Sequence, residues 1–266
     1  MTVILAIDAA WTNTEPSGVA LVARNSNGWK CLCIAPSYDT FLACAENVPV
    51  DWETSRFGGS TPHIPSLLSA AQKIAGTKVD LITLDMPIAT VPFTSRRVAD
   101  DVISRIFGGR GCSTHSPNSK RPGRLGIDIT NQFRNAGYPL ATAIHSSGTL
   151  MRTIEVYPHP ALLRLLNRDY RVPYKVAKSR NYWPELVIQD RIARLLDEFK
   201  EIERALTNIF GHTGLKIPDA SDIRTLAMLK RYEDSIDSLV CAWVGVQYAN
   251  CAAKPYGDRT AAIWIP

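Results

Sequence analysis

The sequence lacks the signatures of several protein classes. Its six cysteines show no C-x-x-C spacing, which argues against a zinc site and for free thiols in a reducing compartment. It contains neither G-x-G-x-x-G nor G-x-x-x-x-G-K-[ST], the usual phosphate-binding loops of nucleotide-binding folds. No apolar run approaches the roughly 20 residues of a membrane span. We therefore expect a cytoplasmic protein with no membrane partner.

The N-terminal stretch MTVILAIDAAW is apolar, yet it lacks the basic start and the cleavage site of a signal peptide. We interpret it as a first buried strand. The chain has 266 residues, of which 45% are hydrophobic and 21% are charged. This composition predicts one globular domain over residues 1–266. The net charge of +5 fits an anionic partner such as nucleic acid.

The first third of the chain is rich in predicted strands. Strand-like runs occupy Val3–Asp8, Gly18–Arg24 and Trp29–Ala35, and an N-S-N-G turn joins the second run to the third. Pro65–Ala75 has helical periodicity, and Val79–Asp85 is typical of a buried strand. The pattern predicts three antiparallel strands, then a helix and a fourth strand.

Helices dominate the remainder of the chain. The predicted elements are a helix at 94–107, a strand at Thr149–Tyr157, helices at 184–210, Pro218–Tyr232 and Asp234–Ala253, and a short edge strand at Thr260–Ile265. The order β-β-β-α-β-α-β-α is typical of a ribonuclease-H-like α/β fold. We expect a mixed five-stranded sheet with flanking helices and a helical insertion at about residues 160–230, before the last helix.

Acidic residues stand at the ends of these elements. Asp8 ends the first strand and Asp85 ends the fourth, while Asp234 and Asp237 share one helix face at i,i+3 spacing. Carboxylates that meet at one sheet edge suit Mg²⁺ or Mn²⁺, which can activate water for phosphodiester cleavage. We expect Asp8, Asp85 and Asp237 to hold metal, with Asp234 and Glu155 completing the catalytic set. Any single one of these acids is also explained as a turn former or helix cap.

Several motifs carry a resemblance to a known family. LAIDAAW followed by SGVAL, then LDMPI, IEVYPHPALLRLL, VPYK and DSIDSLVCAWVG resemble the DUF429 family, which is grouped with nucleases of ribonuclease-H-like fold. The resemblance spans nearly the whole chain. The D-x-x-D of the last helix is also similar to that of RuvC-type resolvases. The resemblance implies that Asp8, Asp85, Asp234 and Asp237 are metal ligands. RuvC-type resolvases, however, usually carry Glu where this chain has Asp85.

Other side chains are further candidates for the site. Glu155 in EVYPHPAL is interpreted as a metal ligand or general base, and His159 as a proton donor or substrate contact. Their structural alternatives are a pair with a buried Arg for Glu155 and a helix cap for His159. Lys175 is a candidate phosphate contact or ordinary surface charge. Trp11 is either a stacking platform for a base or part of the core.

The loop Gly108–Arg124 is flexible in composition and cationic. We expect four cations of this loop to contact substrate phosphates without distinguishing the base sequence of the nucleic acid: Arg110, Lys120, Arg121 and Arg124. The alternative is a solvated surface loop.

Three function classes remain open on this evidence. The leading hypothesis is a divalent-metal-dependent nuclease that acts on DNA or RNA. The second is an ATP-dependent phosphotransferase of the related actin-like fold, and the third is a non-catalytic protein that binds nucleic acid or another ligand. The sequence does not separate DNA from RNA as the substrate.

Overall fold

The fold is built on one mixed β-sheet. The computed structural model describes residues 1–53 and 56–266. Within them the strands are β1 (Thr2–Asp8), β2 (Gly18–Asn25), β3 (Gly28–Ala35), β4 (Leu81–Asp85), β5 (Arg152–Val156), β6 (Lys254–Gly257) and β7 (Ala262–Ile265). They form a seven-stranded sheet in the order β3-β2-β1-β4-β5-β7-β6. β1 pairs antiparallel with β2 and parallel with β4, so it lies near the centre.

The sheet is larger than the sequence pattern predicted. The five expected strands are present, but the C-terminal hairpin extends the sheet from five strands to seven in the described residues. The predicted edge strand Thr260–Ile265 corresponds to β7, which lies between β5 and β6 and is therefore not at the edge. The true edge strand β6 was missed because it is short and contains proline and glycine, both of which weaken a strand pattern.

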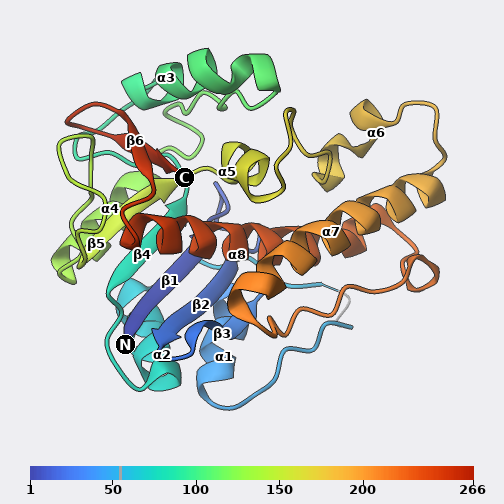
Figure 1. The fold of residues 1–266 in the computed structure, drawn as a ribbon, viewed down its shortest axis with the longest axis horizontal. Helices are drawn as coiled ribbons and strands as arrows, with labels where there is room; N and C mark the ends of the chain where they lie inside the picture. Colours follow the sequence, from blue (N-terminus) through green and yellow to red (C-terminus); the bar gives the residue numbers. More distant parts are fainter. Residues whose placement is uncertain (54–55) are drawn as a thin grey trace.

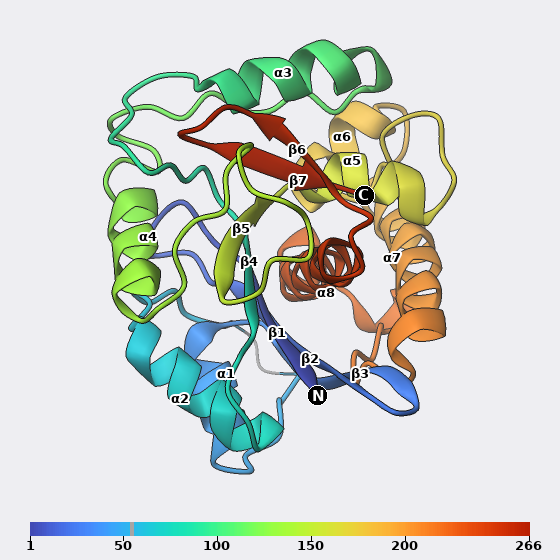
Figure 2. The same ribbon diagram turned by 60° about the vertical axis from the view of Figure 1, so that its left-hand side comes forward.

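Helices cover both faces of the sheet (Figures 1 and 2). They are α1 (Tyr38–Ala45), α2 (Ile64–Ala75), α3 (Val98–Phe107), α4 (Leu125–Asn135), α5 (Pro158–Leu165), α6 (Ser179–Tyr182), α7 (Ile188–Phe210) and α8 (Lys230–Ala249). One core joins the sheet to α5, α7 and α8, and a second joins its other face to α1, α2 and α4. A smaller core lies between α3 and the C-terminal hairpin. Figure 2 shows α8 end-on, between the sheet and α7.

Successive side chains of β1 point to opposite faces of the sheet, so this strand contributes to both cores. Ile4 and Ala6 pack toward α8, whereas Leu5 and Ile7 pack into the core on the opposite face. α8 approaches closely because its Gly245 has no side chain: a Cβ there would lie 2.7 Å from Thr83 Cγ2. The last helix is consequently buried along most of its length and is fixed against the sheet.

Several helical boundaries differ from the predicted ones: α3 begins at Val98, α7 begins at Ile188 and α8 ends at Ala249. The segment Pro218–Tyr232 is not one helix, because it holds only the short 3₁₀ turns Ala220–Asp222 and Leu226–Leu229 before α8 begins. Its Ser, Thr and Asp side chains favour such local turns over a regular helix. α8 begins at Lys230, one turn before the expected Asp234. Among the helices of the described residues, none has both the length and the hydropathy needed to cross a membrane.

Candidate functional site

Two aspartates stand side by side at the carboxyl edge of the sheet. Asp8 and Asp85 are direct register partners on the parallel strands β1 and β4, which places their backbones about 4.8 Å apart. Both carboxylates are half-buried and line a cavity of about 600 Å³. Within the described residues, neither carboxylate has a hydrogen-bond or ion-pair partner. The predicted convergence of these two strand ends is therefore present.

The start of α8 brings further acids to this edge. Gly18 is the register partner of Asp8 on β2, and a Cβ at Gly18 would lie 2.0 Å from the carbonyl oxygen of Asp234. Only glycine permits the helix to begin so close to the strand end. The first two turns of α8 then carry Glu233, Asp234 and Asp237, of which the first two line the cavity. The positive end of a helix dipole favours carboxylates in its first turn.

Lys175 lies against this acidic cluster. Its ammonium group forms ion pairs with Asp237 and, at 3.3 Å, with Glu233. The hydroxyl of Tyr174 donates to the second oxygen of Asp237 at 2.5 Å, and the backbone N–H of Val176 donates to Glu233 at 2.6 Å. Asp237, which the sequence suggested as a metal ligand, is thus bound on both oxygens by protein groups.

Lys230 engages the other end of the cluster. Its ammonium group lies 2.8 Å from Glu233 and 2.5 Å from Asp234. The remaining oxygen of Asp234, Oδ2, is buried without a hydrogen-bond partner. Burial would raise the pKa of Glu233, but Lys175 and Lys230 outweigh it and lower that pKa below the usual range. The two lysines therefore stabilise the ionised form of the acids that they contact.

Asp8 and Asp85, which no cation contacts directly, behave differently. Burial, opposed by Lys175 and reinforced by Asp237, raises the pKa of Asp85 to about 8. Burial and then the charge of Asp237 raise the pKa of Asp8 well above its usual range. Burial, opposed by Lys230, raises the pKa of Asp234 to about 6. The raised pKa values of Asp8 and Asp85 show that further negative charge at this edge is unfavourable unless a cation balances it.

The donor set suits one hard cation better than a closed metal cage. In residues 1–53 and 56–266, no group of three or more His, Cys, Asp and Glu side chains has the arrangement of a metal site. Mg²⁺, however, usually keeps several waters and binds one or two carboxylates together with substrate phosphate. Asp8 and Asp85 offer such a pair of unpaired oxygen ligands at the floor of an open cavity.

Glu155 has a different environment. Its two oxygens accept hydrogen bonds from Arg97 at 2.6 and 2.7 Å, and one of them also accepts from the backbone of Ile88 at 3.1 Å. Arg97 is itself buried and pairs with Asp100. Burial, opposed by Arg97, raises the pKa of Glu155 to about 7. The alternative in which Glu155 pairs with a buried Arg is the one that the structure contains, and Glu155 does not line the cavity.

Cationic and aromatic side chains also line the cavity. The cations that do not contact the acidic cluster are Arg121, Arg171 and Lys178, and we call these three residues the cationic wall. Trp11 and His115 line the same cavity, and their rings meet edge to face with centroids 6.5 Å apart. A cavity lined by both acids and cations suits a ligand that has both a bound metal and a phosphate.

His159 is buried beneath the cationic wall. Its Nε2 accepts a hydrogen bond of 2.7 Å from Arg171, and its ring meets those of Tyr157 and Tyr174 edge to face. Burial and the neighbouring Arg171 lower the pKa of His159 well below its usual range. A neutral His159 therefore orients Arg171 instead of supplying a proton.

The predicted phosphate contacts of the loop divide into two groups. Arg121 reaches the cavity, where it also lies 3.9 Å from Glu15. Arg110 points elsewhere and donates to the carbonyl oxygens of Arg168 and Asp169, each at 2.8 Å. The other two members of the predicted set are not among the cavity-lining residues; they are Lys120 and Arg124.

Sequence reasoning missed part of this cavity. Lys230, Glu233 and Arg171 were not predicted as site residues, although all three line it. The one available signal was the VPYK motif, because the segment R-V-P-Y-K-V-A-K that contains it supplies three of the cavity's cations. Long-range packing of this segment onto the start of α8 carries no periodic signature.

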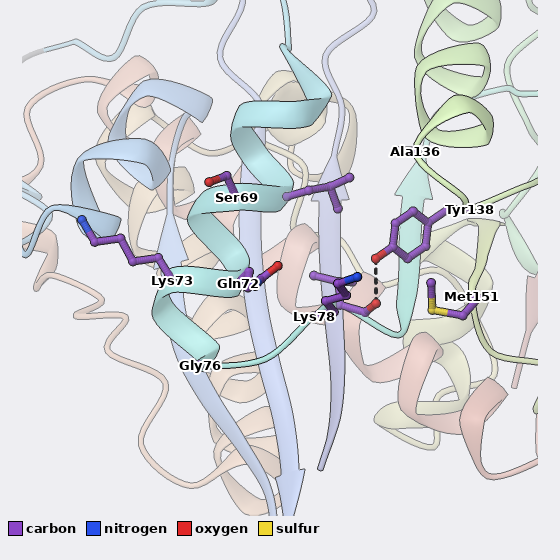
Figure 3. Close-up of a pocket in the computed structure, with 10 residues that line it drawn as sticks. Ser69, Gln72, Lys73, Gly76, Lys78, Ala136, Tyr138 and Met151 are labelled. Carbon is purple, nitrogen blue, oxygen red and sulfur yellow. Dashed lines mark hydrogen bonds between the residues drawn. The ribbon is translucent and has the colours of Figure 1, made fainter.

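A second cavity lies at the opposite edge of the sheet (Figure 3). It measures about 650 Å³ and lies where β4 and β5 begin, next to Lys78 and Met151. Tyr138 closes one side by donating from its hydroxyl to the carbonyl of Val79 at 2.7 Å. Its described lining holds no carboxylate and none of the predicted site residues. The size of a cavity therefore does not identify the site here.

Comparison with known proteins gives one match. A family model described as a protein of unknown function, DUF429, matches residues 14–260. No curated protein and no solved structure matches the chain. Since the match covers most of the sequence, the chain belongs to the DUF429 family.

Proposed function

We propose that this protein is a divalent-metal-dependent phosphodiesterase that cleaves nucleic acid, either DNA or RNA. One observation carries the proposal. Asp8 and Asp85 present two neighbouring carboxylates, without hydrogen-bond or ion-pair partners in the described residues, to a cavity that Arg121, Arg171 and Lys178 also line. A metal bound by the pair and a phosphate bound by the wall would lie in the same cavity.

The arrangement of the sheet supports this assignment. The first five strands run in the order β3-β2-β1-β4-β5, with three antiparallel strands followed by parallel ones. This order supports the proposed ribonuclease-H-like fold, with the β6–β7 hairpin as an addition to it. In mixed α/β sheets, ligands bind outside the carboxyl ends of the parallel strands. The free thiols of the described residues support a reducing compartment such as the cytoplasm.

The residues of the cavity take separate roles in the proposed reaction. Asp8 and Asp85 would hold Mg²⁺ or Mn²⁺, and the bound ion would polarise the phosphoryl oxygens and lower the pKa of water. Asp234, whose pKa of about 6 is close to working pH, accepts the proton of the attacking water. The cationic wall neutralises phosphate charge as the water oxygen bonds to phosphorus and the ester P–O bond breaks. The leaving oxygen takes a proton from solvent.

Metal binding and cleavage test the proposal together. The purified chain is incubated with Mn²⁺ or Mg²⁺ and with single-stranded and duplex DNA and RNA, alongside Asp8→Asn and Asp85→Asn. We expect cleavage that needs the metal and falls at least about 100-fold in either variant. The exposed α4 variant Asp128→Asn keeps its activity, because that side chain lies outside the cavity.

Two results would contradict the proposal. Equal cleavage by the wild type and Asp8→Asn identifies a contaminating nuclease. Absence of both Mn²⁺ binding and cleavage leaves no basis for a metal-dependent enzyme. ATP is included in the same panel, because hydrolysis of ATP without cleavage of any nucleic acid would favour the phosphotransferase alternative.

A further inference from the structure

The cations of this cavity fall into two classes. Lys175 and Lys230 each contact two acids. Arg171 and Lys178 contact no carboxylate in the described part of the chain, and the single acid near Arg121 is the exposed Glu15 at 3.9 Å. The cationic wall is thus largely uncompensated by the protein, whereas the lysines at the acidic side are paired.

Cations that share a concave surface repel one another when no nearby acid balances their charge. Their effect reaches His115, whose pKa is lowered by partial burial and then by Lys178, Arg171 and Arg121. Like charges that line a cavity focus a positive potential into it and attract anions. A bound anion would therefore reduce the repulsion among the cations of the wall, and this gain would favour its binding.

Arg171 is held in place before any ligand arrives. Its guanidinium donates to the carbonyl oxygen of Gly111 at 3.4 Å and to His159 at 2.7 Å, and two tyrosine rings pack around that imidazole. A guanidinium fixed by the protein loses little freedom when it binds an oxyanion. This positioning distinguishes Arg171 from an ordinary surface cation.

The size and lining of the cavity limit the ligand. About 600 Å³ is typical of a small-molecule site. Trp11 and His115 add aromatic surface beside the cations, on which a nucleobase can stack. A terminal phosphate carries a charge of roughly −1.5 to −2 near neutral pH, and a phosphodiester carries less. Several adjacent cations therefore match a terminal phosphate better than an internal one.

We propose that Arg121, Arg171 and Lys178 form a subsite for the terminal phosphate of a nucleotide or of a single-stranded nucleic-acid end. Its place beside Asp8 and Asp85 as the substrate-anchoring part of an active site rests on the proposed function. The subsite binds the phosphate monoester itself, and it orients the adjoining nucleotide toward the carboxylates. The two sources of that phosphate, a free nucleotide and a strand end, are separated by experiment.

Binding is measured in EDTA, so that no cleavage takes place. Calorimetry uses adenosine 5′-monophosphate and adenosine, and anisotropy uses a 3′-labelled oligothymidine with either a 5′-phosphate or a 5′-hydroxyl. We expect the phosphorylated ligands to bind in a salt-sensitive manner and their unphosphorylated counterparts to bind at least about tenfold more weakly. If the oligomer with a 5′-phosphate binds more strongly than the oligomer with a 5′-hydroxyl, the subsite is assigned to strand ends. If the two oligomers bind equally while adenosine 5′-monophosphate still binds more strongly than adenosine, it is assigned to free nucleotides.

The variants Arg121→Ala and Lys178→Ala remove exposed side chains and leave the fold intact. Each is expected to weaken binding of the phosphorylated ligands about tenfold. Arg180→Ala is the matched control, because Arg180 is an exposed cation two residues beyond Lys178 that does not line the cavity. Circular dichroism confirms the fold of each variant.

The subsite is refuted if both variants bind adenosine 5′-monophosphate as the wild type does. It is also refuted if adenosine binds equally well, or if neither phosphorylated ligand binds. Phosphate-dependent binding without cleavage of any nucleic acid in Mn²⁺ would leave the subsite standing and overturn only the proposed nuclease activity.

Discussion

The ammonium group of Lys175 forms an ion pair with the carboxylate of Asp237, in the acidic cluster where the sequence predicted a metal ligand. The pair joins the VPYK segment to the second turn of α8. Burial opposes the charge of Lys175, but Asp237 outweighs it and the pKa of Lys175 rises well above the usual range. A permanent positive charge thus contacts the carboxylate that the sequence predicted as a metal ligand. Under the proposed function, Asp8 and Asp85 are the carboxylates left to hold an ion.

This relationship predicts the number of metal ions that the site holds. The wild-type chain is expected to bind one Mn²⁺, and Lys175→Met is expected to bind a second ion at Asp237 and Glu233, which lose the charge of Lys175. Calorimetry and electron paramagnetic resonance measure the number of ions bound per chain. Lys30→Met, which changes an exposed lysine on β3, serves as the control. Two ions on the wild type, or one ion on Lys175→Met at unchanged affinity, would contradict the prediction.

The raised pKa of Asp85 predicts how metal-free stability depends on pH. The unfolded carboxyl ionises near pH 4, whereas the folded one ionises near 8. Between these values the folded state retains a proton that the unfolded state releases. Stability is therefore greatest below about pH 4 for this group, and it is lost as pH rises to about 8.

Asp85→Asn removes this dependence, since an amide does not ionise. In EDTA, the variant is expected to unfold at a temperature above that of the wild type at pH 8, by about 2–4 °C for each kcal/mol gained. At pH 5 the difference shrinks. Thermal unfolding followed by circular dichroism at both pH values measures it. If the midpoint of the wild type fell no more between pH 5 and pH 8 than that of the variant, the pKa of Asp85 would not be raised by its burial.

The buried pair of Arg97 and Glu155 predicts a stability effect outside the cavity. Arg97→Met leaves Glu155 buried without its partner and is expected to cost about 3–5 kcal/mol in the free energy of unfolding. Adding Glu155→Leu removes one of the two buried carboxylates that lose Arg97, the other being Asp100, and is expected to recover part of that loss. Urea unfolding of the two single variants and the double variant measures the coupling. Additive losses would mean that the two side chains do not act as a pair.

The close approach of β2 and α8 predicts a specific effect at Gly18. Gly18→Ala places a Cβ against the backbone of Asp234, so the start of α8 must move away from Asp8. We expect a loss of about 1–3 kcal/mol in stability, together with weaker Mn²⁺ binding. Gly58→Ala is the matched control, because a Cβ there meets no atom within 4 Å. Unchanged Mn²⁺ affinity in Gly18→Ala would show that the position of α8 does not matter for the metal.

Some features of the site followed directly from sequence patterns. The apolar run before Asp8 and the run before Asp85 predicted two buried strands, and their order predicted that both acids end at one edge. That prediction is confirmed by the register of β1 and β4. The pattern failed where regular periodicity is absent. It did not detect the short strand β6, and it predicted a helix at Pro218–Tyr232 where only 3₁₀ turns occur.

The sequence alone determined the alternation of the strands, the order of the elements and the strand ends that carry acids, because these depend on local periodicity and chain direction. Only the tertiary structure decided which acids are paired and which are not. Lys175 lies 62 residues from Asp237, and Arg97 lies 58 residues from Glu155. Such pairs form only when distant segments pack together, and no local pattern encodes which charges will then meet. In the described part of the chain, that packing left Asp8 and Asp85 without a hydrogen-bond or ion-pair partner in the cavity that the cationic wall also lines.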